Sequence, residues 1–112
     1  DDACLVNYYR YARALILPSL CEGFGIPVLE AYYYYLPLLL SNQSSLPEVA
    51  SDAAMFFNPY DVNDMVRTII ELVENPCRES LITREIERLS SFSWNKSAMQ
   101  QRELLETLWQ RK

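Results

Sequence analysis

Short apolar runs alternate along the chain with longer segments whose apolar residues recur every three or four positions. Each run is too short for a helix and suits a strand buried on both faces of a parallel sheet. The three expected strands are residues 14–19, 37–41 and 54–57. The amphipathic segments predict helices over 2–13, 27–35, from 45 onwards, 61–75, 77–91 and 94–110. This order predicts right-handed βαβ connections and an α/β, Rossmann-like parallel sheet with flanking helices.

Polar residues at fixed positions mark where several helices begin or end. Ser45 and Glu48 have the spacing of a capping box, in which the serine hydroxyl bonds a backbone N–H of the first turn. Asp61 and Ser93 are expected to cap the helices that follow them. Asn75-Pro76 is expected to end the helix that Asp61 begins.

The periodicity also predicts which helix residues face the core. On four helices the apolar side chains gather on one side, which is expected to pack inward. The expected inward residues are Leu5, Tyr8, Tyr9 and Ala12; Val62, Met65, Val66, Ile69, Ile70 and Val73; Leu81, Ile82, Ile86 and Leu89; and Ala98, Met99, Leu105, Leu108 and Trp109.

Three strands are few for a doubly wound sheet, which typically has five or six. The sheet is therefore expected to be incomplete at its N-terminal side, with its open edge covered by further sequence or by another chain. Self-association through this edge is one expectation. The first methionine is Met55, so the 112 residues are interpreted as one partial domain of a longer polypeptide.

Composition excludes several classes of function. The net charge is −5 and the ten basic residues are dispersed, which argues against nucleic-acid binding. No apolar run approaches the roughly 20 residues of a membrane helix. Without histidine, the chain lacks the commonest general base and zinc ligand. Cys4, Cys21 and Cys77 form no Cys-x-x-Cys pair and are interpreted as small, partly buried hydrophobic residues in a reducing cytoplasm.

The only two glycines, Gly23 and Gly25, lie in one loop between a predicted strand and a predicted helix. Ligands bind at this position in open α/β sheets. Glycine lets the backbone turn tightly and approach a ligand closely. The N–H groups of Phe24, Gly25 and Ile26, at the positive end of the helix, would suit an anion such as a diphosphate.

Two carboxylates frame this loop: Glu22 before it and Glu30, expected in the first helical turn. Carboxylates accept hydrogen bonds from paired hydroxyls, so a sugar or a ribose is a natural partner. A glutamate in a first turn more often only interacts with the helix dipole, which stabilises the helix by under about 1 kcal/mol. The combination of both glutamates, the glycines and Pro27 favours a ligand site.

Three segments together resemble a known family: ALILPSLCEGFGIPVLEA, PLLLSNQSSLPEVASDAAMFFNP and FSW. They are similar to the C-terminal domain of retaining GT-B glycosyltransferases of group 1 (family 4), and they occur in the same order. Those enzymes carry a Glu-x7-Glu motif, which Glu22 and Glu30 match. The resemblance implies the C-terminal half of a GT-B fold, truncated at its N-terminal side and lacking its acceptor domain.

The resemblance also implies a function. Residues 1–112 would bind a nucleotide-sugar donor for transfer of a hexosyl group, with retention, as in bacterial polysaccharide biosynthesis. Glu22 would contact the donor sugar near the reacting centre, as the catalytic residue. The backbone at Gly23, Phe24, Gly25 and Ile26 would line the sugar and diphosphate site, and Glu30 would bind the ribose. No metal or cofactor is implied, and these residues alone are expected to be inactive. The full-length protein would be cytoplasmic, either free or peripheral to the inner face of a membrane.

Tyr35 is the main departure from the family pattern, because it stands where the family has glycine. If the backbone there is left-handed, tyrosine costs roughly 1–2 kcal/mol relative to glycine. Tyrosines at 32–35 surround the helix, so at least one ring is expected to face solvent or a partner. They fill core space more often than they form a stacking platform. An α/β interaction module that keeps the fold without activity is therefore the alternative function.

Overall fold

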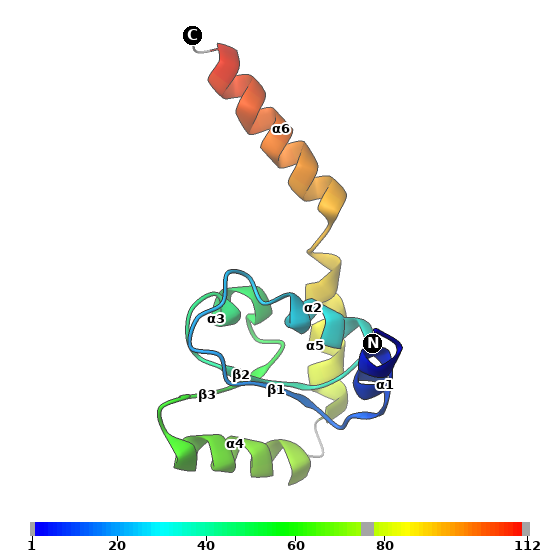
Figure 1. The fold of residues 1–112 in the computed structure, drawn as a ribbon, viewed down its shortest axis with the longest axis vertical. Helices are drawn as coiled ribbons and strands as arrows, with labels where there is room; N and C mark the ends of the chain where they lie inside the picture. The colour runs from blue at the N-terminus through cyan, green and yellow to red at the C-terminus, as the bar shows by residue number, and fades with distance from the viewer. Residues whose placement is uncertain (1, 75–77, 111–112) are drawn as a thin grey trace.

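The sheet expected from the apolar runs is present in the computed structural model, which describes residues 2–74 and 78–110. Strands β1 (Leu15–Leu17), β2 (Leu38–Ser41) and β3 (Met55–Phe57) are parallel and lie in the order β1-β2-β3 (Figure 1). Leu17 pairs with Leu40, and Leu40 with Phe56. The central strand is buried at every residue, as expected for a strand covered on both faces.

All six expected helices are present. They are α1 (Asp2–Tyr11), α2 (Ile26–Tyr33), α3 (Leu46–Ala50), α4 (Val62–Glu74), α5 (Arg78–Ser90) and α6 (Trp94–Gln110). Asp61 caps α4 as predicted, because its carboxylate accepts the N–H groups of Asn63 and Asp64. Ser93 Oγ accepts the N–H of Lys96 at 3.4 Å in the first turn of α6. The predicted helix end at Asn75-Pro76, and Cys77, lie outside the described residues. Cys4 and Cys21 are exposed, so the expectation that they are partly buried is wrong.

The core lies between the sheet and helices α2, α3 and α5 (Figure 1). Tyr32 is fully buried, and its hydroxyl donates to the carbonyl of Ala53 at 3.1 Å. Burial, followed by the negative charge of Glu85, raises the pKa of Tyr32 well above its ordinary value. Arg88 of α5 donates to the carbonyls of Val49 and Glu48, at 2.8 and 2.7 Å, and so fixes α5 to α3.

Two expected inward faces are wrong in part. On α1, Tyr9 is buried, but Leu5, Tyr8 and Ala12 are exposed. On α5, Leu81 is buried and Ile86 is exposed. Both helices lie at the margin of the small core, so only part of each apolar side meets other residues.

The apolar side of α4 is covered only in part, contrary to the prediction: Met65 and Ile69 are half-buried, and the other expected residues are exposed. Val62 and Val73 are 71% and 66% exposed, while Thr68 is buried and donates to the carbonyl of Asp64. The reason is that α4 packs chiefly against β3, at the edge of a narrow sheet. A periodic pattern shows which side of a helix is apolar, but it does not show whether the chain provides a surface to cover that side.

Helix α6 departs most from the prediction. It projects from the body of the molecule (Figure 1), whose principal extents are 57 × 31 × 30 Å. None of its side chains is buried. The residues expected to face inward are exposed: Ala98, Met99, Leu105, Leu108 and Trp109.

Candidate functional site

The loop between β1 and α2 is attached to the turn that follows β2. Ser44 Oγ donates to the carbonyl of Glu22 at 2.9 Å and accepts its N–H at 3.1 Å. Ser45 Oγ donates to the same carbonyl at 3.1 Å. Ser45 is the residue before α3, but its side chain does not cap that helix, so the predicted capping box with Glu48 is wrong. Its hydroxyl is directed to the neighbouring loop instead.

These contacts fix the backbone of Glu22 but do not involve its carboxylate. The residue is half-buried, and within the described part of the chain its side chain makes no hydrogen bond or ion pair. A carboxylate at the carboxyl end of a parallel strand can therefore meet a ligand without first breaking a salt bridge.

Gly25 is the residue before α2, with a φ of +94° in the left-handed region. A Cβ at this position would lie 2.9 Å from Leu46 Cδ2, so α3 approaches the loop too closely for a side chain. Gly23 has open space around it. In the described structure the N–H groups of Phe24, Gly25 and Ile26 donate no hydrogen bond and remain available to an acceptor.

Phe24 contacts the segment before α6. Its ring meets that of Phe92 edge to face, with centroids 5.7 Å apart. Phe92 also lies beneath the guanidinium of Arg88, 5.0 Å from its ring centroid. The glycine loop and the FSW segment, far apart in sequence, are thus adjacent in space.

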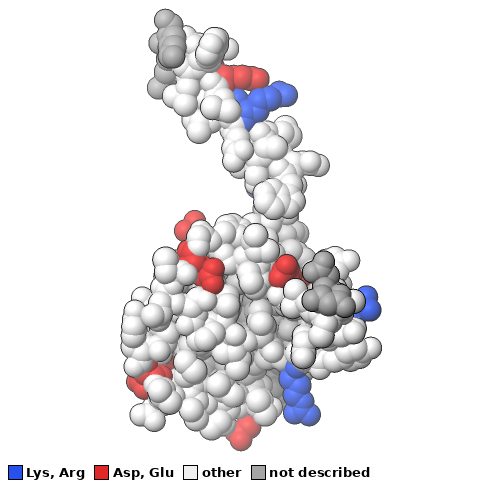
Figure 2. Space-filling view, in the orientation of Figure 1, with Lys and Arg blue, Asp and Glu red and all other residues white. Residues whose placement is uncertain are grey.

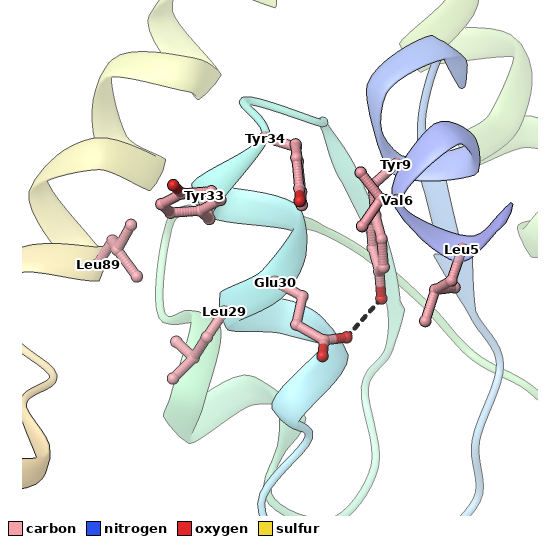
Figure 3. A pocket seen from close by; sticks show the side chains of 8 residues that line it. All are labelled: Leu5, Val6, Tyr9, Leu29, Glu30, Tyr33, Tyr34 and Leu89. Atoms are coloured by element: carbon pink, nitrogen blue, oxygen red, sulfur yellow. Dashed lines mark hydrogen bonds between the residues drawn. The ribbon is translucent and has the colours of Figure 1, made fainter. Parts of the chain in front are cut away.

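Glu30 lies in the second turn of α2, because the helix begins at Ile26; the prediction of a first-turn position is wrong. The Tyr9 hydroxyl donates to Glu30 Oε2 at 2.7 Å (Figure 3). Both residues line a cavity of about 380 Å³ between α1, α2 and α5. The other lining residues are Leu5, Val6, Leu29, Tyr33, Tyr34 and Leu89. Glu22 is not among them, so this cavity holds only one of the two glutamates.

Tyr9 is the site residue that sequence reasoning missed, since it was predicted only as part of an inward helix face. Its ring is 9% exposed and stacks on that of Tyr34, with centroids 5.5 Å apart and planes 11° apart. Burial, the hydrogen bond to Glu30 and the charge of that carboxylate raise the pKa of Tyr9 to about 12. Its place on α1 gave no signal of the Glu30 contact, which joins residues 21 positions apart.

The left-handed backbone considered for Tyr35 is present, with a φ of +56°. It arises because α2 ends in a Schellman motif, which needs a left-handed residue just after the helix. The N–H of Leu36 bonds the carbonyl of Ala31, and the N–H of Tyr35 bonds that of Tyr32. Rings of the tyrosine run also face solvent as expected, since Tyr33 and Tyr35 are 69% and 58% exposed.

Tyr35→Gly is therefore expected to stabilise the fold. Glycine removes the left-handed strain, and the larger conformational entropy of its unfolded chain offsets part of that gain, which leaves about 0.5–1 kcal/mol. Tyr33→Gly, at the last residue of α2, is the matched control and should lower the free energy of unfolding by up to about 1 kcal/mol. Urea denaturation measures both, and a loss of stability in Tyr35→Gly would show that the strain is absent.

Charged side chains are scattered over the face seen in Figure 2, and no basic patch is visible on it. Among residues 2–74 and 78–110, no helix is long and apolar enough to cross a membrane. The same residues contain no group of three or more acidic or cysteine side chains placed to hold a metal ion.

Comparisons with known proteins agree with the resemblance in the motifs. The family model described as glycosyl transferases group 1 matches residues 1–88. The O-antigen chain mannosyltransferase B of Escherichia coli is 37% identical over 100 residues, covering 88% of this chain and 26% of that protein. The MMP alpha-(1->4)-mannosyltransferase of Mycolicibacterium hassiacum is 31% identical over 112 residues, covering 89% of this chain and 26% of its own length.

A solved structure gives the same result for the fold. Sucrose-phosphate synthase from Thermosynechococcus elongatus matches with a TM-score of 0.82 and 25% identity, over 100% of this chain and 29% of that one. The expected fold class, an α/β parallel sheet from the C-terminal half of a GT-B fold, is confirmed. The chain spans about a quarter of the length of these two mannosyltransferases. It belongs to the group 1 glycosyl transferase family.

Proposed function

We propose that residues 1–112 form the nucleotide-sugar-binding domain of a retaining hexosyltransferase. The observation that carries this proposal is the Glu30 carboxylate, which lies in an open, mainly apolar cavity and is held there by a single hydroxyl donor. An apolar pocket with a few directed polar groups is the usual form of a small-molecule site. The mannosyltransferases similar to this chain support a hexosyl group as the one transferred.

The parts of the donor would distribute along α2 and the loop before it. The ribose hydroxyls would donate to Glu30, whose carboxylate offers about four acceptor sites, of which Tyr9 occupies one. The base would lie against the apolar walls formed by Leu5, Val6 and Leu29. The diphosphate would meet the available N–H groups of the glycine loop. Glu22 would face the donor sugar at the reacting centre.

Transfer of the sugar would require the intact protein. Departure of a nucleoside diphosphate requires stabilisation of negative charge on the phosphates, which backbone N–H groups supply without a metal or a cofactor. The acceptor would bind to a separate N-terminal domain, and residues 1–112 alone would not transfer. The free edge of β1 would be covered by that further sequence or by a second copy. The protein would act in the cytoplasm, free or peripheral to a membrane.

Glu30→Ala is expected to weaken donor binding by about 1–3 kcal/mol, the range for losing hydrogen bonds to a charged group. The intact protein is titrated calorimetrically with UDP-, GDP- and ADP-hexoses to find its donor, and the variant is then titrated with that donor. Glu74→Ala, at the exposed end of α4 far along the chain from the loop, is the control and should bind as the wild type does.

Two results would contradict the assignment. If the wild type binds none of the donors, the alternative of an inactive interaction module is favoured, with the exposed rings of Tyr33 and Tyr35 as its contact surface. If the wild type binds and Glu30→Ala keeps its affinity, the ribose lies elsewhere.

A further inference from the structure

The hydrogen bond between Tyr9 and Glu30 joins a fixed group to a mobile one. Tyr9 is held in place, because the residue is buried and its ring is stacked on that of Tyr34. Glu30 is exposed on the surface of α2 and has three side-chain torsions. A long, exposed carboxylate samples several rotamers, and fixing it on binding has an entropic cost. The 2.7 Å bond restricts this sampling before any ligand arrives.

The phenol is suited to remain a donor in this position. Hydrogen bonds to an ionised acceptor are about twice as strong as neutral ones. A phenol with its ordinary pKa of about 10 already keeps its proton throughout the physiological range, and burial together with Glu30 raises the pKa of Tyr9 further, to about 12. It cannot become a second negative charge beside Glu30. One carboxylate oxygen is thereby engaged (Figure 3), and within the described part of the chain the Glu30 carboxylate accepts no other hydrogen bond.

We propose that Tyr9 is a positioning residue, whose hydroxyl holds the Glu30 carboxylate in the orientation that accepts the two ribose hydroxyls of the donor. This inference rests on the proposed function and adds to it a residue outside the Glu-x7-Glu motif. Tyr34 contributes indirectly to the position of Glu30, because its ring stacks on that of Tyr9 and so fixes Tyr9. The site is therefore preorganised by α1, although the glutamate that contacts the ribose belongs to α2.

Tyr9→Phe in the intact protein tests the proposal, since it keeps the ring and the stack and removes only the hydroxyl. The KM for whichever of the UDP-, GDP- and ADP-hexoses binds the wild type should rise roughly tenfold, equivalent to about 1.4 kcal/mol, with little change in kcat. With the 2′,3′-dideoxyribose form of that donor, the wild type and the variant should have the same KM. If the hydroxyl had a purely structural role, Tyr9→Phe would change the KM equally for donors with and without the ribose hydroxyls.

Tyr8→Phe is the matched control. It makes the same substitution on the same helix at an exposed ring that is not part of the cavity, and it should leave the KM unchanged. An unchanged KM in Tyr9→Phe overturns the proposal. A lower KM also overturns it, because Tyr9 would then compete with the ribose for Glu30. An equal rise with both donors overturns it in favour of a general effect on the fold.

A second measurement avoids any loss of folding. Incorporation of 3-fluorotyrosine at position 9 keeps both the ring and the hydroxyl. Its ¹⁹F resonance should shift further when UDP, GDP or ADP, whichever binds the wild type, is added than when the 2′,3′-dideoxy form of that nucleotide is added. The same shift from both nucleotides, or none from the ribonucleotide, contradicts the proposal. Failure of the wild type to bind any nucleotide would overturn the proposed function itself. That result is distinct from the outcomes that contradict only the role of Tyr9.

Discussion

Gly25→Ala is expected to lower the free energy of unfolding by about 2–5 kcal/mol. Two costs add: the left-handed φ of +94° costs roughly 1–2 kcal/mol for a residue with a Cβ, and overpacking a dense region typically costs 1–3 kcal/mol. The new Cβ would lie 2.9 Å from Leu46 Cδ2. Leu46 is fully buried, so its side chain has little space in which to move away.

Gly23→Ala is the matched control, two residues away in the same loop. No atom of the described residues lies within 4 Å of the place that its Cβ would take, so the change in stability should stay within about 0.5 kcal/mol. Urea denaturation followed by circular dichroism measures both variants. Equal stabilities for the two would show that the close approach of α3 to Gly25 does not constrain the loop.

Glu22→Gln is expected to reduce kcat of the intact protein by about 10²–10³, with a much smaller effect on the donor KM. As the bond to the leaving diphosphate breaks, positive charge develops on the sugar carbon, and a carboxylate nearby would stabilise that charge. Glutamine keeps the shape and removes the charge. No cation in the described residues pairs with Glu22, so the full charge would act on the donor.

The split between kcat and KM distinguishes the two glutamates. Loss of Glu22 should lower kcat, because its interaction strengthens in the transition state, whereas loss of Glu30 should chiefly raise KM. Glu87→Gln, at an exposed position on α5, is the control for removing a carboxylate. A Glu22→Gln protein that retains its kcat within a few-fold would remove Glu22 from the catalytic role.

The positions of the elements could be predicted from the sequence because local patterns determine them. The strand at Leu38–Ser41 is a continuous apolar run, and Asp61 caps its helix through neighbouring N–H groups. The outward sides of α4 and α6 could not be predicted in this way. An apolar stripe specifies a helix face that favours burial, but whether it is covered depends on how far the sheet extends beyond β1 and β3.

In the candidate site, too, the features set by local sequence could be predicted and those set by tertiary contacts could not. The glycine loop follows from its place between a strand and a helix, and the left-handed Tyr35 followed from comparing its position with the family pattern. The turn occupied by Glu30 was misjudged, because helix boundaries are uncertain by one or two residues. The bond from Tyr9 to Glu30 connects two helices through a tertiary contact, and no local pattern encodes such a contact.

Because the Glu22 backbone is hydrogen-bonded to Ser44 and Ser45, the two loops that carry these residues should be transferred together when the site is exchanged between family members. A graft of the loop between β1 and α2 alone would separate the Glu22 backbone from the hydroxyls that fix it. It would also place Gly25 against an α3 surface of different shape. Chimeric transferases with altered donor preference should therefore carry both loops, residues 18–25 and 42–46, as one cassette.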